Sequence, residues 1–299
     1  HGRRTRTAAA RLRSQKKGVD TSMTNEQPGA TTGYVDVPGG RLYYEVAGQG
    51  QPILFVHADV SDHSMWDEQV AAFAPTYRVI SYDKRGFGKT TSEDGAYSPR
   101  EDIVALLAHL GVTRTFVVGL SNGGAQSLDF TLEHPEMVDG LVVVAGGVSG
   151  YEATPTEDEL RIFKTYEELE ERKDEAGLVD LGVHVWCDGP FQPEGRAAAS
   201  VRERIRATMS ATARDHHEDL TPSQLEPPAV ERLNAMTTPT LVLLGVYDFP
   251  ETNSAMELLA ARVSGAQKMA FETAHMANME QPAQFNERVG AFFAATAGR

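Results

Sequence analysis

One serine near the middle of the chain stands in a pattern that can activate it for nucleophilic attack. Residues 117–124 read Val-Val-Gly-Leu-Ser-Asn-Gly-Gly, so Ser121 has a glycine two residues away on either side, between an apolar β-branched run and a segment of helical character. This is the G-x-S-x-G pattern of a nucleophile elbow, a strand-to-helix turn so tight that glycine is needed where the backbone comes closest to itself. The turn exposes the hydroxyl, and a helix beginning near Asn122 directs free N–H groups at an oxyanion formed beside it. We therefore predict that Ser121 is a catalytic nucleophile.

A hydroxyl alone is a weak nucleophile, so the chain must also supply a base and an acid that orients this base. Residues 239–248 and 267–275 each contain a short run typical of a buried parallel strand, and these segments end in Asp248 and His275. Each of the three side chains therefore comes just after the carboxyl end of a predicted strand. Because parallel strands share that end, we predict that Ser121, Asp248 and His275 meet in space as a catalytic triad.

Four further segments accompany the elbow, and together they make the chain resemble the α/β-hydrolase superfamily over roughly residues 34–299. They are residues 55–59 with Met65 and Trp66, residues 82–90, residues 133–138 and residues 274–282. The resemblance implies an α/β fold, with a mostly parallel, doubly wound sheet and a helical cap inserted after the sixth strand. It also implies the serine-hydrolase branch, because the branches that attack with a carboxylate need Asp at the position of Ser121.

The resemblance places an oxyanion hole of two backbone N–H groups beside the serine. One donor is expected from Asn122, and the other from the residue just after a His-Gly dipeptide, which reads His57-Ala58 in this chain. We assign the second donor to Asp59, with Ala58 as the alternative. Because an inward carboxylate would oppose an oxyanion, we expect the Asp59 side chain to point outward or to pair with a neighbour.

Several polar residues near these motifs have structural roles in this interpretation. His57 ends a strand beside the predicted oxyanion hole, and the resemblance makes it structural rather than catalytic. Asp83 and Arg85 are expected to form a pair that braces the loop under the pocket. Residues 215–219 include metal-binding residue types but repeat no ligand spacing, so we predict no metal site there. Acyl transfer by a serine triad needs no cofactor, and we predict none.

The spacing of strand-like runs divides the chain into a core and an insertion. Residues 33–37 and 41–46 alternate as a hairpin would, and four apolar runs then alternate with helix-length segments, which predicts a parallel sheet with crossover helices. This rhythm stops at residue 146 and resumes at Pro239. We therefore assign residues 34–147 and 236–299 to the hydrolase core and residues 148–235 to the helical cap.

Three apolar residues of the predicted cap are candidates for substrate contact: Trp186, Phe191 and Met209. The resemblance implies that the cap covers the serine, so these side chains are expected to face the pocket. The alternative is that they only hold the cap together.

Composition limits the classes of partner. The chain has 299 residues and a net charge of −14, and residues 23–299 carry 21 basic and 41 acidic groups, a surface that should repel nucleic acid and anionic membranes. No apolar stretch approaches the roughly 20 residues of a spanning helix. Cys187 is the single cysteine, which excludes a disulfide within the chain. These features are consistent with a cytoplasmic enzyme acting on a small molecule, and they allow a homodimer.

The first 33 residues differ from the rest of the chain. Residues 1–22 hold seven basic groups against one acidic group, Asp20, and have no apolar region of a secretion signal. We expect residues 1–33 to form a disordered basic tail, with Met23 as the natural start. An Arg-rich targeting peptide is the alternative for residues 1–22.

The expected reaction is acyl transfer to water from a small carboxylic ester or lactone, with an acyl-enzyme on Ser121. Cleavage of a C–C bond next to a carbonyl in a diketone-type substrate uses the same machinery and is the alternative within enzymes. A ligand-binding member of the fold without catalysis is the alternative outside them.

Overall fold

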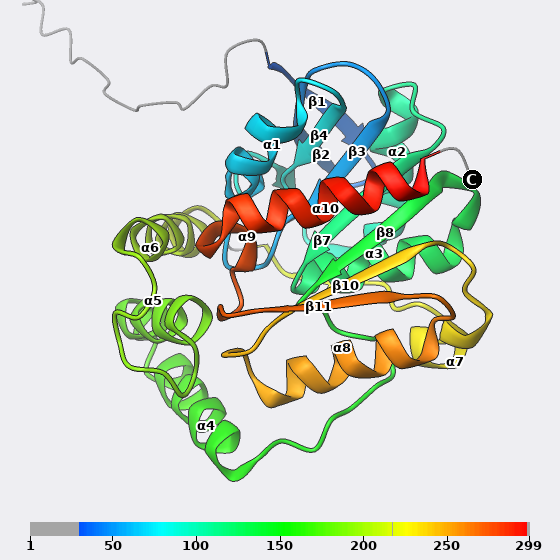
Figure 1. The fold of residues 1–299 in the computed structure, drawn as a ribbon. Coiled ribbons are helices and arrows are strands. Elements are labelled where there is room, and N and C mark those ends of the chain that lie inside the picture. The colour runs from blue at the N-terminus through cyan, green and yellow to red at the C-terminus, as the bar shows by residue number, and fades with distance from the viewer. Residues whose placement is uncertain (1–29, 217, 298–299) are drawn as a thin grey trace, which may run out of the picture.

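The computed structural model describes residues 30–216 and 218–297, and these residues surround one large sheet (Figure 1). The nine-stranded sheet has the order β1-β2-β4-β3-β7-β8-β10-β11, and the short strand β5 pairs with β2. The strands span β1 (Thr31–Val37), β2 (Gly40–Ala47), β3 (Pro52–Val56), β4 (Arg78–Tyr82), β5 (Thr91–Ser92), β7 (Thr115–Leu120), β8 (Val138–Val144), β10 (Thr240–Gly245) and β11 (Gln267–Phe271).

The sheet is antiparallel at one edge and parallel elsewhere. β1 and β2 form the predicted hairpin, in which Val37 lies opposite Gly40, and β2 also runs antiparallel to β4. From β4 onward every neighbouring pair is parallel. β3 lies between β4 and β7, so the chain reverses its direction of winding there. In open α/β sheets ligands bind at such a switch point, beyond the carboxyl ends of the strands.

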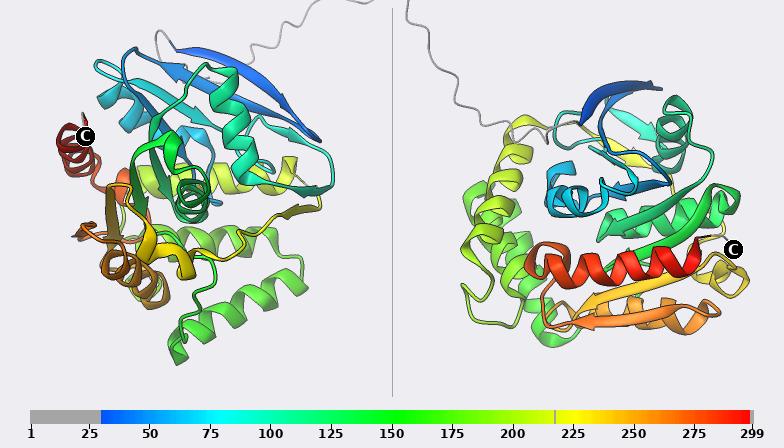
Figure 2. Two further views of the ribbon diagram at one scale, coloured as in Figure 1. Left: turned by 90° about the vertical axis from the view of Figure 1, so that its right-hand side faces the viewer. Right: turned by 45° about the horizontal axis from the view of Figure 1, so that its top comes forward.

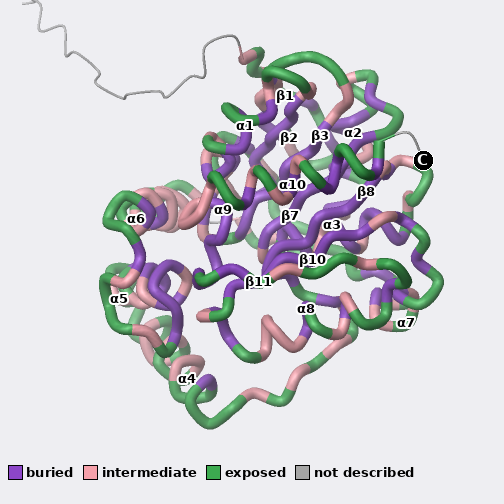
Figure 3. Tube along the Cα trace, viewed as in Figure 1, coloured by how far each residue is buried: buried purple, intermediate pink, exposed green. Residues whose placement is uncertain are grey.

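Helices cover both faces of the sheet because alternate strand residues point to opposite sides. In β3, Leu54 and Val56 join one buried cluster, whereas Ile53 and Phe55 join the other. The first cluster lies under α2 (Pro99–His109), α3 (Asn122–Glu133) and α8 (Pro250–Arg262), and the second under α1 (Asp67–Phe73), α9 (Ala277–Glu280) and α10 (Pro282–Thr296) (Figures 1 and 2). Figure 3 shows the central strands, such as β7 and β10, as the most continuously buried part of the trace. The fold is therefore the predicted doubly wound α/β architecture.

The start of α2 carries the local signals of a helix N-terminus. The Ser98 hydroxyl accepts a hydrogen bond from the Glu101 N–H, and Pro99 occupies the first turn of the helix. This helix leads directly into β7, the strand that carries Ser121 at its end.

Between β8 and β10 the chain forms α4 (Glu157–Glu171), α5 (Glu175–Val183), a π-helical turn (His184–Asp188) and α6 (Ala199–Asp215), which lie together beside the sheet (Figure 2). The short helix α7 (Ala229–Arg232) then leads back to the core. The sequence predicted this insertion only as a helical cap, and the π-helical turn within it was not predicted. A two-stranded sheet of β6 (Gly95–Tyr97) and β9 (Leu220–Pro222) was also missed, because its three-residue strands carry no periodic signal.

The beginning of the chain corrects one boundary. β1 starts at Thr31, so residues 31–33, which the sequence placed in the tail, belong to the sheet edge. The predictions for residues 1–29 and for Met23 lie outside the described residues. In the part of the chain that the structure describes, no helix is long and apolar enough to cross a membrane.

Candidate active site

Ser121 lies on a strained turn between β7 and α3. Its backbone has φ 59° and ψ −129°, a left-handed conformation that costs a non-glycine residue free energy and is typical of a nucleophile elbow. Glycines on both sides allow the close approach: a Cβ on Gly119 would lie 2.3 Å from the Gly123 carbonyl oxygen, and one on Gly123 would lie 2.4 Å from the Val56 carbonyl oxygen. The Ser121 N–H donates to the Val144 carbonyl at 2.9 Å, which ties the turn to the end of β8.

Asp248 and His275 come together from two neighbouring strand ends. Asp248 follows β10 and His275 follows β11, and His275 Nδ1 donates to Asp248 Oδ2 at 2.6 Å. The other carboxylate oxygen accepts from the Phe249 N–H at 2.8 Å. Both side chains are buried, with His275 only 3% exposed. The bond to Asp248 fixes the proton on Nδ1 and leaves the Nε2 lone pair available as a base.

His275 Nε2 is buried and forms no hydrogen bond with a described residue. Ser121 and His275 line the same pocket, which has a volume of about 430 Å³. The base and the hydroxyl therefore share one cavity, although no hydrogen bond joins them in this structure. Such bonds are commonly long in unliganded enzymes and shorten when substrate binds.

Trp186 completes this end of the pocket. Its indole lies 4.6 Å from the His275 ring, centroid to centroid, and the residue belongs to the π-helical turn, a distortion frequent at functional sites. Arg196 holds the turn to the core, because its guanidinium donates to the Cys187 carbonyl at 2.8 Å and pairs with Glu280 at 2.7 Å. Glu280 in turn accepts from the Ala274 N–H at 2.8 Å, next to His275.

The pocket extends well beyond the predicted triad residues. It runs from Ser121 and Trp186 along α3 and is closed by residues that follow β8, by the segment after β9 and by the first turns of α8. The lining residues are Pro99, Arg100, Ser121, Asn122, Ala125, Gln126, Asp129, Ala145, Gly146, Gly147, Val148, Ser149, Tyr151, Ala153, Trp186, Pro222, Ser223, Gln224, Glu251, Thr252, Ala255 and His275.

Two predicted pocket residues lie elsewhere, and their places correct that expectation. Phe191 is 45% exposed and meets the Phe249 ring edge-on at 6.3 Å. Met209 packs between α6 and α5, where its Cε would be 2.4 Å from a Cβ on Gly182. Neither lines the pocket. Both were assigned from residue type alone, and this shows neither the path of the turn that carries Phe191 nor the face of α6 on which Met209 lies.

The predicted oxyanion donors lie next to one another because β3 and β7 are neighbours. The Asn122 N–H is in the first turn of α3, where helices have no internal acceptor. The Ala58 N–H donates to Met65 Sδ at 3.3 Å, so it is already engaged. For the Asp59 N–H the structure gives no acceptor among the described residues. Neither Ala58 nor Asp59 belongs to the pocket lining.

The Asp59 carboxylate pairs with neighbours, one of the two outcomes expected. It accepts from the Asn122 side-chain amide at 2.7 Å and forms an ion pair with the buried ammonium of Lys84. The lysine side chain is only 5% exposed and also lies over the Phe87 ring. The negative charge beside the elbow is therefore offset by a cation, and the Asn122 side chain is held in place.

His57 is a structural residue in this arrangement. Its Nδ1 donates to the Ala58 carbonyl at 2.7 Å and its Nε2 accepts from the Lys84 N–H at 2.9 Å. Burial and the Lys84 charge hold its pKa well below the usual value, so the ring is neutral. It joins the loops after β3 and β4, on which Asp59 and Lys84 lie.

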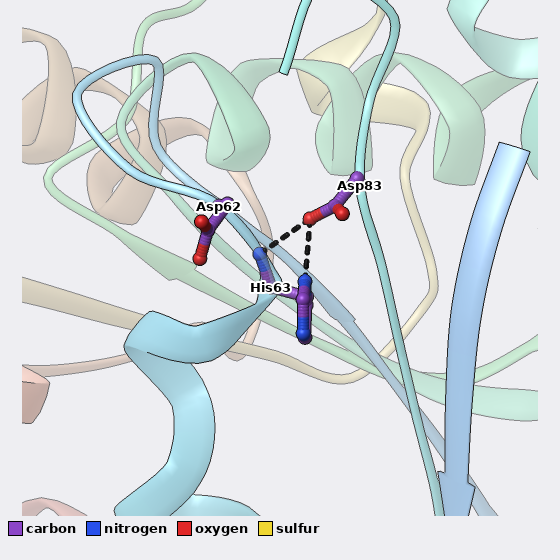
Figure 4. A group of neighbouring side chains, drawn as sticks. All are labelled: Asp62, His63 and Asp83. Carbon is purple, nitrogen blue, oxygen red and sulfur yellow. Dashed lines mark hydrogen bonds and ion pairs between the residues drawn. The ribbon is translucent and has the colours of Figure 1, made fainter. Parts of the chain in front are cut away.

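Asp83 and Arg85 do not pair with each other, which corrects the expected brace. Arg85 forms a bidentate ion pair with Asp102 at 2.7 and 2.8 Å, whereas Asp83 accepts from the ring and the backbone N–H of His63 at 2.7 and 2.8 Å (Figure 4). Asp83 and Arg85, which are two residues apart in the loop after β4, thus pair with two different residues.

Asp62, His63 and Asp83 are close enough to hold a cation, but their bonds fit an ion-paired brace (Figure 4). The second ring nitrogen of His63 lies 3.1 Å from Glu45 Oε1. Burial disfavours the charged ring, but the charge of Asp83 and hydrogen bonds to Asp83 and Glu45 outweigh it and raise the pKa of His63 to about 10. With both nitrogens protonated, the ring has no lone pair for a metal.

The structure also brings residues to the pocket that sequence reasoning missed. Asp129 could have been found from α3 itself, since it shares a helical face with Asn122 and Gln126. Glu251 and Arg100 come from distant segments, and no local signal marks them. Cys187 has no place in the chemistry, because burial and the charges of Asp188 and Glu280 raise the pKa of its thiol to about 12.

Comparison with known proteins agrees with this fold. Residues 51–282 match the family model described as the alpha/beta hydrolase fold, so the chain belongs to that family of enzymes. It is 24% identical to 3-oxoadipate enol-lactonase 2 of Acinetobacter baylyi, over 84% of this chain and 92% of the relative. It is 25% identical to a 2-hydroxy-6-oxononadienedioate/2-hydroxy-6-oxononatrienedioate hydrolase of a Pseudomonas species, over 85% of this chain and 92% of the relative. A solved hydrolase structure from Pseudomonas aeruginosa PA01 superposes with a TM-score of 0.67 at 26% identity, over 88% of this chain and 98% of that one.

Proposed function

We propose that the protein hydrolyses a small carboxylic ester or lactone through a Ser121–His275–Asp248 triad. The observation that carries the proposal is the buried His275 ring, which lines the same pocket as Ser121; Asp248 binds its Nδ1, and its Nε2 has no hydrogen-bond partner among the described residues. The enol-lactonase relative has a name that fits this reaction class.

The proposed reaction has two steps. His275 Nε2 takes the Ser121 proton as the oxygen attacks the substrate carbonyl, and the Asp248 carboxylate stabilises the imidazolium that forms. The N–H groups of Asn122 and Asp59 bind the tetrahedral oxyanion, each contributing about 3 kcal/mol in comparable sites. The imidazolium then protonates the leaving oxygen. In the second step water attacks the acyl-enzyme, with His275 again as the base, and the acid product leaves.

The residues near the elbow support this assignment of donors. Met65 already engages the Ala58 N–H, so we assign the second donor to Asp59. Lys84 offsets the Asp59 charge, so that an oxyanion formed nearby is not opposed by an unpaired carboxylate.

C–C bond hydrolysis of a diketone-type substrate is the second candidate. The Pseudomonas relative, named as a hydrolase of an oxo-dienedioate, favours it. The same triad would act, but the leaving group would be a carbon that needs protonation. Assays with substrates of each class are needed to distinguish ester or lactone hydrolysis from C–C bond hydrolysis.

Probe labelling and substrate assays test the proposal together. A fluorophosphonate should label the wild type at Ser121, and p-nitrophenyl esters or lactones should be hydrolysed. Ser121→Ala should abolish both, and Asp248→Asn should lower kcat by roughly 10⁴-fold. Ser200→Ala, which removes an exposed serine of α6, is the matched control and should keep both.

The outcomes separate the candidate functions. Turnover of vinylogous diketones without turnover of esters or lactones would replace the first candidate by C–C hydrolysis. A folded wild type that neither reacts with the probe nor turns over any of these substrates would exclude the triad and favour a ligand-binding member of the fold.

A further inference from the structure

The floor of the pocket is one face of α3 that leads away from Ser121. Asn122, Ala125, Gln126 and Asp129 all line the pocket, and their spacing places them on one side of the helix. Asp129 follows the serine by two helical turns, about 12 Å along the axis. Because helical side chains lean toward the N-terminus, its carboxylate lies nearer the serine than this spacing. The pocket thus has a reactive end and a distal end at Asp129.

Two carboxylates belong to the lining, and neither forms an ion pair with a described Lys or Arg, although the charges of Arg100 and Arg232 act on Asp129 from nearby. One oxygen of Asp129 accepts from the Ser149 hydroxyl at 2.9 Å. Glu251, in the first turn of α8, has a carboxylate that forms no hydrogen bond or ion pair with a residue that the structure describes. Acidic groups therefore enter the cavity from both α3 and α8.

The single Arg or Lys side chain of the lining is already neutralised. Arg100 forms an ion pair with Glu133 through Nε, and its terminal nitrogens donate to the carbonyls of Ser223 at 3.1 Å and Gln224 at 3.2 Å. An anionic substrate group would have to compete with these partners. Arg100 therefore holds the segment after β9 in place and is not a binding group for an anionic substrate.

The surroundings of both carboxylates make a cation the favoured partner. Burial raises the pKa of Asp129, although Ser149, Arg100 and Arg232 act in the opposite direction. Burial and the charge of Glu159 raise the pKa of Glu251. A bound cation would offset the cost of keeping these groups charged. Tyr151 adds an aromatic surface to the same cavity, and such a surface attracts ammonium groups.

We infer that this pocket selects substrates with a cationic group, such as an ammonium, at the end remote from the scissile carbonyl, and that Asp129 and Glu251 recognise it. The inference rests on the proposed function, and it adds to that function a preference for positively charged substrates. It also separates this chain from the dienedioate hydrolase relative, whose name denotes a dicarboxylate substrate.

Three matched p-nitrophenyl esters test the inference. Their acyl chains have five methylene groups and end in trimethylammonium, in the uncharged tert-butyl isostere or in carboxylate. A second series of esters carries the same three terminal groups on the alcohol half. It is needed because either half of the ester could occupy the distal end of the pocket. In at least one series, kcat/KM should rise about tenfold from the tert-butyl to the ammonium ester and fall about tenfold for the carboxylate ester, the size of one partly desolvated ion-pair or cation–π contact.

Two substitutions assign the effect to the named residues. In Asp129→Asn and Glu251→Gln the ratio of ammonium to tert-butyl ester should fall toward one, and the carboxylate ester should gain. Glu257→Gln is the matched control, because Glu257 lies on the exposed side of α8 and pairs with Lys268. The ratio of ammonium to tert-butyl ester in Glu257→Gln should equal that of the wild type.

The inference is overturned if the wild-type ratio is near one in both series, or if neither substitution changes it. Failure of the proposed function gives a different result: the tert-butyl ester would then show no hydrolysis that depends on Ser121.

Discussion

The indole of Trp186 lies against the imidazole of His275, with 4.6 Å between ring centroids and 50° between ring planes. Trp186 comes from the π-helical turn that follows α5, whereas His275 follows the last strand of the sheet. The insertion between β8 and β10 therefore contacts the proposed base directly. The ion pair of Arg196 with Glu280 keeps the two parts in this arrangement.

Removing the indole should slow the reaction by exposing the imidazole to water. Trp186→Ala is expected to lower kcat for esters by about tenfold, the effect of losing one aromatic contact. Trp186→Phe keeps a ring and should retain most of the activity. Steady-state kinetics of both variants, with circular dichroism to verify folding, measures the effect. Equal kcat in the alanine and phenylalanine variants would contradict a role for the ring.

The ion pair of Lys84 with Asp59 should protect the oxyanion hole. Lys84→Met leaves the Asp59 charge unpaired beside Asn122, and we expect kcat to fall about tenfold or more because this charge opposes the oxyanion. Loss of this partner should also destabilise the fold, by only about 1 kcal/mol because the Asp59 side chain is 46% exposed and water screens its charge. Kinetics and urea unfolding measure the two effects separately.

A double substitution distinguishes charge from packing. Adding Asp59→Asn to Lys84→Met removes the unpaired carboxylate, so kcat should return to within about threefold of the wild type. If the double variant is as slow as Lys84→Met, the lysine acts through packing and the electrostatic explanation is wrong.

The buried His63 brace should give the fold a pH-dependent stability. Its pKa is raised to about 10, so its contribution is complete below the unfolded value of about 6.5 and is lost as the pH rises through 10. His63→Gln should therefore lower the free energy of unfolding by about 3 kcal/mol near pH 6. The difference from the wild type should shrink toward pH 10.

Urea unfolding of both proteins between pH 6 and 10 measures this difference. His109→Gln is the control, because His109 bonds only the Tyr44 hydroxyl, at 3.1 Å, and lies outside the brace. A wild-type advantage that stays constant up to pH 10 would show that His63 does not act as a charged group.

Local signals were sufficient for the elements of the core. Ser98 and Pro99 mark the start of α2, the glycines around Ser121 mark the elbow, and the apolar runs before Asp248 and His275 form β10 and β11. These predictions succeed because a cap, a tight turn and a buried strand are each dictated by neighbouring residues. The π-helical turn and the strand pair β6–β9 were missed because contacts far along the chain stabilise them.

The sequence by itself determined the sheet, the elbow and the chain order of serine, aspartate and histidine. The carboxyl ends of parallel strands lie at one edge of the sheet, whichever helices pack on its faces. Tertiary structure alone decided that Trp186 lines the pocket while Phe191 and Met209 do not, and that Asp59 pairs with Lys84. It also decided that Asp129 and Glu251 share a cavity. These contacts join segments between 25 and more than 100 residues apart. Their geometry depends on how helices pack on the sheet, and no local pattern encodes it.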